Sequence, residues 1–269
     1  MIIDFHTHIF PDKIATRTID LLSKNEGIPS YSDGTVKGLI AKMEAGGTDI
    51  SINLPVLTNP NQFDSVNAFA KEINEFFKYK KKRIISFAGI HPLCEGIDEK
   101  MKFIKDSGFS GVKIHPDYQG AFINDDGYLR IVECAKEYDL IVVTHSGVDP
   151  AFKDAPIRCT PQLAKEIIKK TGHKKMVFAH MGANELYSQV INTLAGEDVY
   201  LDTSFVLKTI KKETFIDILE RHGEDKILFA SDSPWNDIKD NLSIIKSFSL
   251  KKETEDKLLY LNAKGLLGI

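Results

Sequence analysis

The sequence predicts an α/β fold: one slightly distorted (β/α)8 barrel of the TIM type that takes up residues 1–269 and ends in a helical segment. Short apolar runs alternate with longer amphipathic segments along the chain. The runs are hydrophobic almost throughout rather than at every second residue, as expected for parallel strands that are buried on both faces. A length of 269 residues is ordinary for one closed barrel of this kind.

The apolar runs predict the strands of the barrel, and there is one run for each of the eight strand–helix units. The predicted strands are Ile2–Phe5, Asp49–Leu54, Ile84–Ile90, Gly111–Ile114, Leu140–Thr144, Met176–Ala179, Val199–Asp202 and Ile227–Ala230. An open doubly wound sheet is the alternative. No run is followed by a G-x-G-x-x-G or G-x-x-x-x-G-K-[ST] loop, which are the usual marks of a nucleotide-binding open sheet. The sequence therefore favours the closed barrel.

The segments between the runs predict helices, because their apolar residues recur at the spacing of one helix face. In Val36–Gly47 the apolar residues Val36, Leu39, Ile40 and Met43 have this spacing, and a glycine ends the segment. The other predicted helices are Ser65–Lys80, Glu99–Asp106, Gly127–Glu137, Thr160–Thr171, Asn184–Leu194, Lys211–His222 and Asp237–Phe248. A last segment, Thr254–Gly268, is expected to cover the barrel edge or pack on its side. Two longer connections, Ile9–Gly34 and Ser146–Cys159, are expected to be irregular and to lie on the carboxyl face, where barrel active sites form.

Composition narrows the classes of partner. The net charge is −3, and the one basic run, Lys78–Arg83, is interpreted as a solvated helix end, so neither nucleic acid nor an anionic membrane is expected as a partner. Three cysteines without a C-x-x-C pair indicate a reducing cytoplasm rather than a disulfide framework. No apolar run approaches the roughly 18 residues that span a bilayer. The sequence leaves open whether the chain forms a homodimer.

Histidines gather at the predicted strand ends. His6 and His8 follow the first strand, and because side chains two apart in a strand share a side, both rings can reach one ion. Six of the eight histidines lie at such ends, whereas His173 and His222 lie near helix ends. The polar residues that end the later strands are His91, Lys113, His115, His145, His180 and Asp232.

This placement predicts a metal site at the barrel mouth. A metal needs three or four ligands, and His6, His8, His145 and Asp232 are the expected set. For His180 we favour a catalytic or substrate-polarising role, with metal ligation and a structural role left open. His91 and His115 precede prolines and are also explained as loop-shaping residues. His115 is kept as a candidate substrate-binding residue.

Other polar residues are candidates for supporting roles. Lys113 is either an ion-pair partner inside the barrel or a pocket group. Asp4 points inward two residues before His6, where it either orients a ligand or belongs to a polar layer of the barrel. Arg158 could bind a substrate carboxylate with two parallel hydrogen bonds, or be an exposed loop residue. Trp235, the only tryptophan, is expected to wall the pocket.

The motifs D-F-H-T-H, T-H-S-G, A-H-M-G and S-D-S-P-W, in this order, resemble the amidohydrolase superfamily. The G-V-K-I-H-P segment and the ending N-A-K-G-L-L-G are similar to the branch that includes aminocarboxymuconate semialdehyde decarboxylase. The resemblance spans Asp4 to Gly268. It implies one divalent metal, usually zinc, at His6, His8, His145 and Asp232, with His180 activating water or polarising the substrate. It also leaves open a second metal bridged by a carboxylated Lys113.

The resemblance implies an enzyme but does not choose the reaction. The expected activity is hydrolysis of a small amide, lactone or related carboxylate by a metal-activated water, with Asp232 as proton acceptor and His180 as oxyanion partner. The alternative is a metal-dependent, non-oxidative decarboxylase on the same fold. TatD-type nucleases and PHP phosphoesterases fit less well: the third strand ends in G-I-H-P rather than near a glutamate, and S-D-S-P-W lacks a histidine. A non-catalytic metal-binding barrel is the remaining hypothesis.

Overall fold

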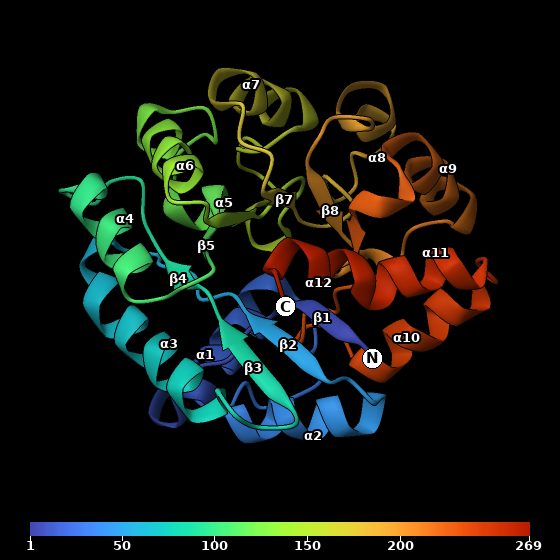
Figure 1. The fold of residues 1–269 in the computed structure, drawn as a ribbon, viewed down its shortest axis with the longest axis horizontal. Helices are drawn as coiled ribbons and strands as arrows, with labels where there is room; N and C mark the ends of the chain where they lie inside the picture. Colours follow the sequence, from blue (N-terminus) through green and yellow to red (C-terminus); the bar gives the residue numbers. More distant parts are fainter.

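The computed structural model describes residues 1–269 apart from the side chain of Glu26. Its strands form two parallel sheets, and the helices stand around them (Figure 1). The first sheet holds β1 (Ile3–Thr7), β2 (Ile50–Asn53) and β3 (Arg83–Ser86). The second sheet follows chain order and consists of β4 (Ala88–Gly89), β5 (Gly111–Ile114), β6 (Ile141–Thr144), β7 (Met176–Phe178), β8 (Tyr200–Asp202) and β9 (Ile227–Leu228).

Backbone hydrogen bonds join the two sheets at both seams. The amide of Phe5 donates to the carbonyl of Phe229 at 2.9 Å, and the amide of Asp232 donates to the carbonyl of His6 at 2.9 Å, which links the β9 segment to β1. At the other seam β3 and β4 are consecutive and are separated only by Phe87, whose amide donates to the Asn53 carbonyl at 2.9 Å. The predicted barrel fold is therefore confirmed, with its strands in sequence order around the ring.

One predicted strand is divided. The run Ile84–Ile90 was expected to be continuous, but it forms β3 and β4 with a break at Phe87. The Phe87 ring is fully buried and lies where a side chain at Gly111 would have to be: a Cβ there would come within 2.6 Å of the ring. The strand is therefore interrupted at the point where this ring enters the core.

Most predicted helices are present: α2 (Val36–Gly46), α3 (Phe63–Phe77), α4 (Ile97–Asp106), α6 (Asp126–Glu137), α7 (Pro161–Thr171), α9 (Lys212–His222) and α10 (Ile238–Ser247). The predicted helix Asn184–Leu194 is shorter, with α8 (Tyr187–Gln189) followed by one π-helical turn, Val190–Leu194. The reason is that the Asn184 amide donates to the Ser146 carbonyl at 3.0 Å, which holds this residue in a loop.

The expectation that the connection Ile9–Gly34 is irregular is wrong, because it contains the helix α1 (Asp12–Glu26). Ala15 and Ile19 are its buried hydrophobic residues, and together with Leu22 they recur at the spacing of one helix face, so the sequence does carry a signal for this helix. The connection Ser146–Cys159 does contain little regular structure, namely a short 3-10 turn at Pro150–Phe152.

The C-terminal segment closes the amino end of the barrel. It forms α11 (Lys252–Asp256), one π-helical turn at Lys257–Leu261 and α12 (Asn262–Leu267). Ala263 and Leu266 pack in one cluster with residues near the starts of strands, such as Ile3 and Ile141. Because this end is covered, the open end is the carboxyl end, where the histidines lie. Among the described residues, no helix is long and apolar enough to cross a membrane.

Candidate metal centre and active site

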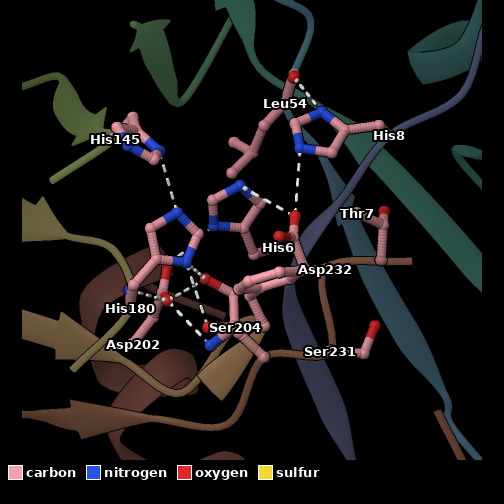
Figure 2. A network of polar contacts seen from close by, with 12 residues as sticks. His6, Thr7, His8, Leu54, His145, His180, Asp202, Ser204, Ser231 and Asp232 are labelled. Carbon is pink, nitrogen blue, oxygen red and sulfur yellow. Dashed lines mark hydrogen bonds and ion pairs between the residues drawn. The ribbon is translucent and has the colours of Figure 1, made fainter. Parts of the chain in front are cut away.

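Three predicted ligands converge at the seam between β1 and β9. His6 lies in β1, His8 follows it, and Asp232 follows β9. The Oδ1 atom of Asp232 lies 3.2 Å from Nε2 of His8 and 3.6 Å from Nε2 of His6 (Figure 2). Their ligand atoms all lie within 4.8 Å of one another. We call His6, His8 and Asp232 the triad.

Hydrogen bonds behind the two histidines assign their protons. Nδ1 of His8 lies 2.8 Å from the carbonyl oxygen of Leu54, and a carbonyl can only accept, so the His8 proton is on Nδ1. Nδ1 of His6 lies 2.9 Å from Oδ2 of Asp202 and likewise carries the proton. In a neutral imidazole the other nitrogen then presents a lone pair. Both Nε2 atoms therefore present lone pairs toward the Asp232 carboxylate.

Three electron-pair donors that face one another in a buried place are the arrangement that a cation stabilises, and the Lys113 amine, 3.1 Å from Nε2 of His6, contacts one of them. Oδ1 of Asp232 is buried and makes no hydrogen bond within the described part of the chain. Such an atom is costly unless an ion or a proton satisfies it. Burial lowers the pKa of His6 to about 4, which keeps this ring neutral as a ligand must be. The triad thus fits a divalent metal by its donor types, its spacing and its unsatisfied oxygen.

Lys113 lies beside the triad. Its Nζ is 3.1 Å from Nε2 of His6, and its side chain is buried at the end of β5. Burial lowers the pKa of Lys113 to about 8, opposed by the charges of Asp202 and Asp232. Whether Lys113 acts as an ion-pair partner or as a pocket group stays a prediction. Its carboxylation stays a prediction.

A second group of donors lies across the mouth, at the ends of β5 and β6. Its members are His115, Asp117, His145 and Asp149, which we call the β5–β6 cluster. Oδ2 of Asp149 lies 3.5 Å from Nε2 of His115 and 4.0 Å from Nε2 of His145. Oδ2 of Asp117 lies 3.6 Å from Nε2 of His145. The rings of His115 and His145 stack at a centroid distance of 4.3 Å.

Acid groups in this cluster are perturbed in the direction expected for buried carboxylates. Burial, with the charges of Asp117 and Asp232 nearby, raises the pKa of Asp149 to about 7. Burial also raises the pKa of Asp117, although Arg158 opposes this. Neither aspartate is among the site residues predicted from the sequence. The one available signal was spacing, since Asp117 lies two residues after His115 and Asp149 four after His145.

His180 links the two groups. Its Nε2 lies 3.0 Å from Nδ1 of His145, and its Nδ1 lies 3.0 Å from the Ser204 carbonyl oxygen (Figure 2). The His6 and His180 rings are stacked 5.7 Å apart. Burial lowers the pKa of His180, so this ring is neutral in the resting site. The structure therefore puts His180 between the triad and His145, and its catalytic role stays a prediction.

The predicted fourth ligand, His145, does not join the triad directly. Its Nδ1 faces His180, and its Nε2 faces Asp117 and Asp149. Its place in the same ligand set as His6 and His8 stays a prediction.

The orienting carboxylate of the triad is Asp202 rather than Asp4. Asp4 accepts hydrogen bonds from the Ser231 amide at 2.8 Å and hydroxyl at 2.6 Å, and burial raises its pKa to about 7. It therefore belongs to a polar layer that joins β1 to the β9 segment. Asp202 also ends a predicted strand, Val199–Asp202, so its position at the barrel mouth follows from the sequence, whereas its contact with the His6 ring does not.

The remaining candidates lie at or near the mouth. Nη1 of Arg158 lies 3.4 Å from Oδ1 of Asp117, so this arginine borders the β5–β6 cluster. Trp235 is buried, and its amide donates to the Asp232 carbonyl at 2.8 Å. His91 accepts a hydrogen bond from the Leu93 amide at 3.1 Å, which fits its interpretation as a loop-shaping residue. The roles of Arg158, Trp235 and His115 toward a substrate stay predictions.

The site is enclosed by its loops. The His8 side chain is 14% exposed, whereas the His6, His145 and Asp232 side chains are 1–7% exposed. Two open hollows on the surface, lined by residues within 185–214 and within 16–33, include none of these residues.

Comparison with known proteins supplies the family context. A family model described as amidohydrolase matches residues 3–269. No curated protein matches the sequence. Among solved structures, the chain is similar to 5-carboxyvanillate decarboxylase from Sphingomonas paucimobilis, with 13% identity, a TM-score of 0.70, and coverage of 100% of this chain and 99% of that one.

Two further structures are informative for the chemistry. Dihydroxybenzoic acid decarboxylase from Polaromonas sp. JS666, with bound manganese and the inhibitor 2-nitroresorcinol, has 15% identity and a TM-score of 0.72 over 99% of this chain and 96% of that one. A probable 2-pyrone-4,6-dicarboxylic acid hydrolase from Acinetobacter baumannii, with citric acid bound, has 15% identity and a TM-score of 0.70 over 100% and 99%. At these identities the likeness establishes the fold.

Proposed function

Because this chain belongs to the amidohydrolase family, we propose that it is a metal-dependent decarboxylase of a small aromatic or unsaturated carboxylic acid. The reaction converts R–COO⁻ and H⁺ into R–H and CO2, with no oxidant and no reductant. Three named neighbours in fold, acting on 2,6-dihydroxybenzoate, 5-carboxyvanillate and dihydroxybenzoic acid, catalyse a reaction of this kind, and one of them holds manganese. This is a different reaction from the hydrolysis that the sequence analysis put first.

The observation that carries the proposal is the convergence of three electron-pair donors on one buried point, with Oδ1 of Asp232 unsatisfied among the described residues. His6, His8 and Asp232 would hold a divalent cation, with His145 as the predicted further ligand. Imidazole donors suit zinc, and the carboxylate also suits manganese. When bound, the cation supplies positive charge that holds the acid and stabilises the negative charge left when CO2 departs.

The protein's own groups would bind the acid and manage the proton. Lys113, beside the triad, and Arg158, beside Asp117, would favour an anionic substrate. His180 is the proposed proton carrier: its Nε2, which faces Nδ1 of His145 in the resting site, would exchange this partner for the substrate and deliver a proton to the carbon that loses the carboxyl group. Its Nδ1–H bond to the Ser204 carbonyl keeps the ring oriented during this transfer. His115 and Trp235 would shape the pocket around the acid.

Hydrolysis is the second candidate, because one fold neighbour is a probable hydrolase of 2-pyrone-4,6-dicarboxylic acid. The same triad could bind a water molecule, with Asp232 accepting its proton and His180 donating a hydrogen bond to the oxyanion. The two reactions differ in the fate of solvent: decarboxylation places a solvent hydrogen on carbon, whereas hydrolysis places a solvent oxygen in the product.

The deciding experiment uses that difference. The protein, loaded with Mn²⁺ or Zn²⁺, is incubated with hydroxybenzoic acids, unsaturated acids, lactones and amides in D2O, and in parallel in H2¹⁸O. The proposal expects CO2 release and one deuterium on the carbon that carried the carboxyl group. Incorporation of solvent ¹⁸O into the product of a lactone or amide, without release of CO2, would instead establish hydrolysis. The Asp232→Asn variant is the inactive control, and the His222→Gln variant, changed at a buried histidine away from the mouth, is the active control.

A further inference from the structure

We propose that Phe205 determines which acids this enzyme accepts: its ring forms an apolar wall beside His180, against which the flat ring of an aromatic acid packs. The inference rests on the proposed function and narrows its substrate class from small aromatic or unsaturated acids to aromatic ones. Three observations support it: the backbone conformation of Phe205, the hydrogen bonds that hold this conformation, and the position of the ring.

The backbone of Phe205 has an unfavourable conformation. Its φ of 67° and ψ of −41° lie outside the regions that residues with a side chain usually adopt. The Val206 amide donates to the Ser204 carbonyl at 2.8 Å across this residue, which makes the segment a γ-turn of the rare, strained kind. Glycine would adopt this turn at little cost, yet the sequence has a phenylalanine there. Strained residues of this kind cluster at active sites and ligand-binding positions.

Hydrogen bonds from the segment after β9 hold the turn. Nδ2 of Asn236, a buried side chain, donates to the Phe205 carbonyl at 2.8 Å, and the Phe205 amide donates to the Ser231 carbonyl at 3.4 Å. The Ser204 carbonyl of the same turn also lies 3.0 Å from Nδ1 of His180. The turn is therefore fixed to the segment after β9 on one side and to His180 on the other.

This turn places the Phe205 ring beside the His180 ring and outside the core. The two ring centroids are 6.1 Å apart and the ring planes are inclined at 74°, which is an edge-to-face contact. Phe205 is partly exposed, and among the described residues it belongs to neither hydrophobic core cluster. Packing in the core therefore does not explain this ring, and part of its surface is available to a ligand at the mouth.

The position beside His180 decides what the ring can contact. In the proposed reaction His180 delivers a proton to the carbon that loses the carboxyl group, so this carbon must come next to the His180 ring. The rest of the acid is then within reach of Phe205. Aromatic pairs favour edge-to-face and offset stacked contacts, and they gain free energy beyond that of the buried area. An aromatic acid therefore gains more from this wall than a saturated acid of similar size and the same charge.

The test is a matched pair of acids that differ in aromaticity. Binding of 2-hydroxybenzoate and of cis-2-hydroxycyclohexanecarboxylate to the Mn²⁺-loaded, full-length protein is measured by isothermal titration calorimetry. Both acids carry one carboxylate and a neighbouring hydroxyl group. We expect the parent protein to prefer 2-hydroxybenzoate and Phe205→Tyr to keep that preference. Phe205→Leu should reduce it by about threefold to tenfold, since the aromatic contact is lost while apolar bulk remains. Phe76→Leu, changed at an exposed phenylalanine on α3, should match the parent.

A role of Phe205 that only supports the His180 ring predicts a different result. Phe205→Leu would then weaken the binding of both acids equally and leave the ratio of their dissociation constants unchanged, which would overturn the proposal. An equal affinity of the parent protein for the two acids, or no measurable binding of either, would overturn it as well.

A glycine variant removes the ring without straining the turn. Phe205→Gly should also lower the preference, and it should resist urea at least as well as Phe205→Ala, because glycine adopts a positive φ freely. A glycine variant that keeps the preference would contradict the proposal. Circular dichroism of each variant separates lost binding from unfolding.

This inference and the proposed function fail in different measurements, because calorimetry reads binding and the D2O experiment reads the reaction. An intact aromatic preference without CO2 release rejects the proposed function alone. Decarboxylation with a ratio that Phe205→Leu leaves unchanged rejects this inference alone.

Discussion

The triad and the β5–β6 cluster offer similar donors, but they are built differently. In the triad, His6 lies in β1 and His8 follows directly after it. The His6 ring is held in place by Asp202, and the His8 ring by the Leu54 carbonyl. In the β5–β6 cluster, Asp117 lies on a four-residue helix and Asp149 in a loop. The histidines of the triad are thus already in the tautomer that a metal needs. Ligands on a strand, with their rings held by further hydrogen bonds, form a preorganised site. Ligands on loops form a site that must rearrange when it binds a metal.

The largest expected effect comes from breaking the triad itself. In Asp232→Asn, the anionic ligand becomes neutral, so the His6–His8 pair should lose its metal and activity should fall by about a thousandfold or more, since metal electrostatics contribute several kcal/mol. Metal analysis and steady-state kinetics on an acid that the D2O screen identifies would check this. Full activity with a full metal complement would remove Asp232 from the site.

His180→Asn tests the link between the two regions. The change removes the ring that we assign as proton carrier but leaves the triad side chains in place, so kcat should fall by about a hundredfold or more while KM changes little. Metal content at the triad should equal that of the parent protein. A variant that loses triad metal but keeps its turnover per bound metal would show that His180 supports binding rather than proton transfer.

Asp202→Asn tests the preorganisation that distinguishes the triad. Oδ1 of Asp202 accepts the amides of His180 and Ser204, so the introduced side-chain amide should keep its oxygen there and turn its NH2 group toward Nδ1 of His6. This would drive the His6 proton to Nε2, the atom that faces the metal. Metal affinity at the triad should fall by about 10- to 100-fold, as is usual when such a partner is lost. Competition titrations against a chelator would measure this affinity. An unchanged affinity would contradict the assignment of Asp202 to the triad.

The difference between the regions also explains how far the sequence could predict the fold and the site. Continuous apolar runs located the strands, and Gly111–Ile114 has the predicted bounds because it is buried on both faces. Alternation within one strand put His6 and His8 together, and the shared direction of parallel strands brought Asp232 to them. The sequence also carries a signal for α1, since Ala15, Ile19 and Leu22 recur at the spacing of one helix face.

The parts of the site that the sequence missed depend on contacts between distant segments. Asp202 matters because the end of β8 lies behind His6, 196 residues away in the chain. Asp117 and Asp149 lie on a short helix and in a loop that turn inward, and such short connections leave no periodic pattern. The direction of the His145 ring is decided by its hydrogen bond to His180, so a rule that places strand ends together could not say which donors this ring would face.

The smallest expected effect concerns a buried histidine with both nitrogens satisfied. Nε2 of His222 donates to the Val199 carbonyl at 3.0 Å, and its Nδ1 accepts from the Gly196 amide at 3.3 Å. Burial lowers its pKa to about 4, below the usual 6.5. As the pH falls, the His222 ring therefore takes up a proton in the unfolded chain before it does so in the folded chain. The contribution of the neutral His222 ring to folding stability is complete above pH 6.5 and is lost as the pH falls toward 4. Relative to His222→Gln, whose amide can make both hydrogen bonds, the parent should lose about 2 kcal/mol of unfolding free energy between about pH 7 and about pH 5. Urea unfolding of the two metal-free proteins would measure this, and a pH-independent difference would mean that His222 keeps an ordinary pKa in the fold.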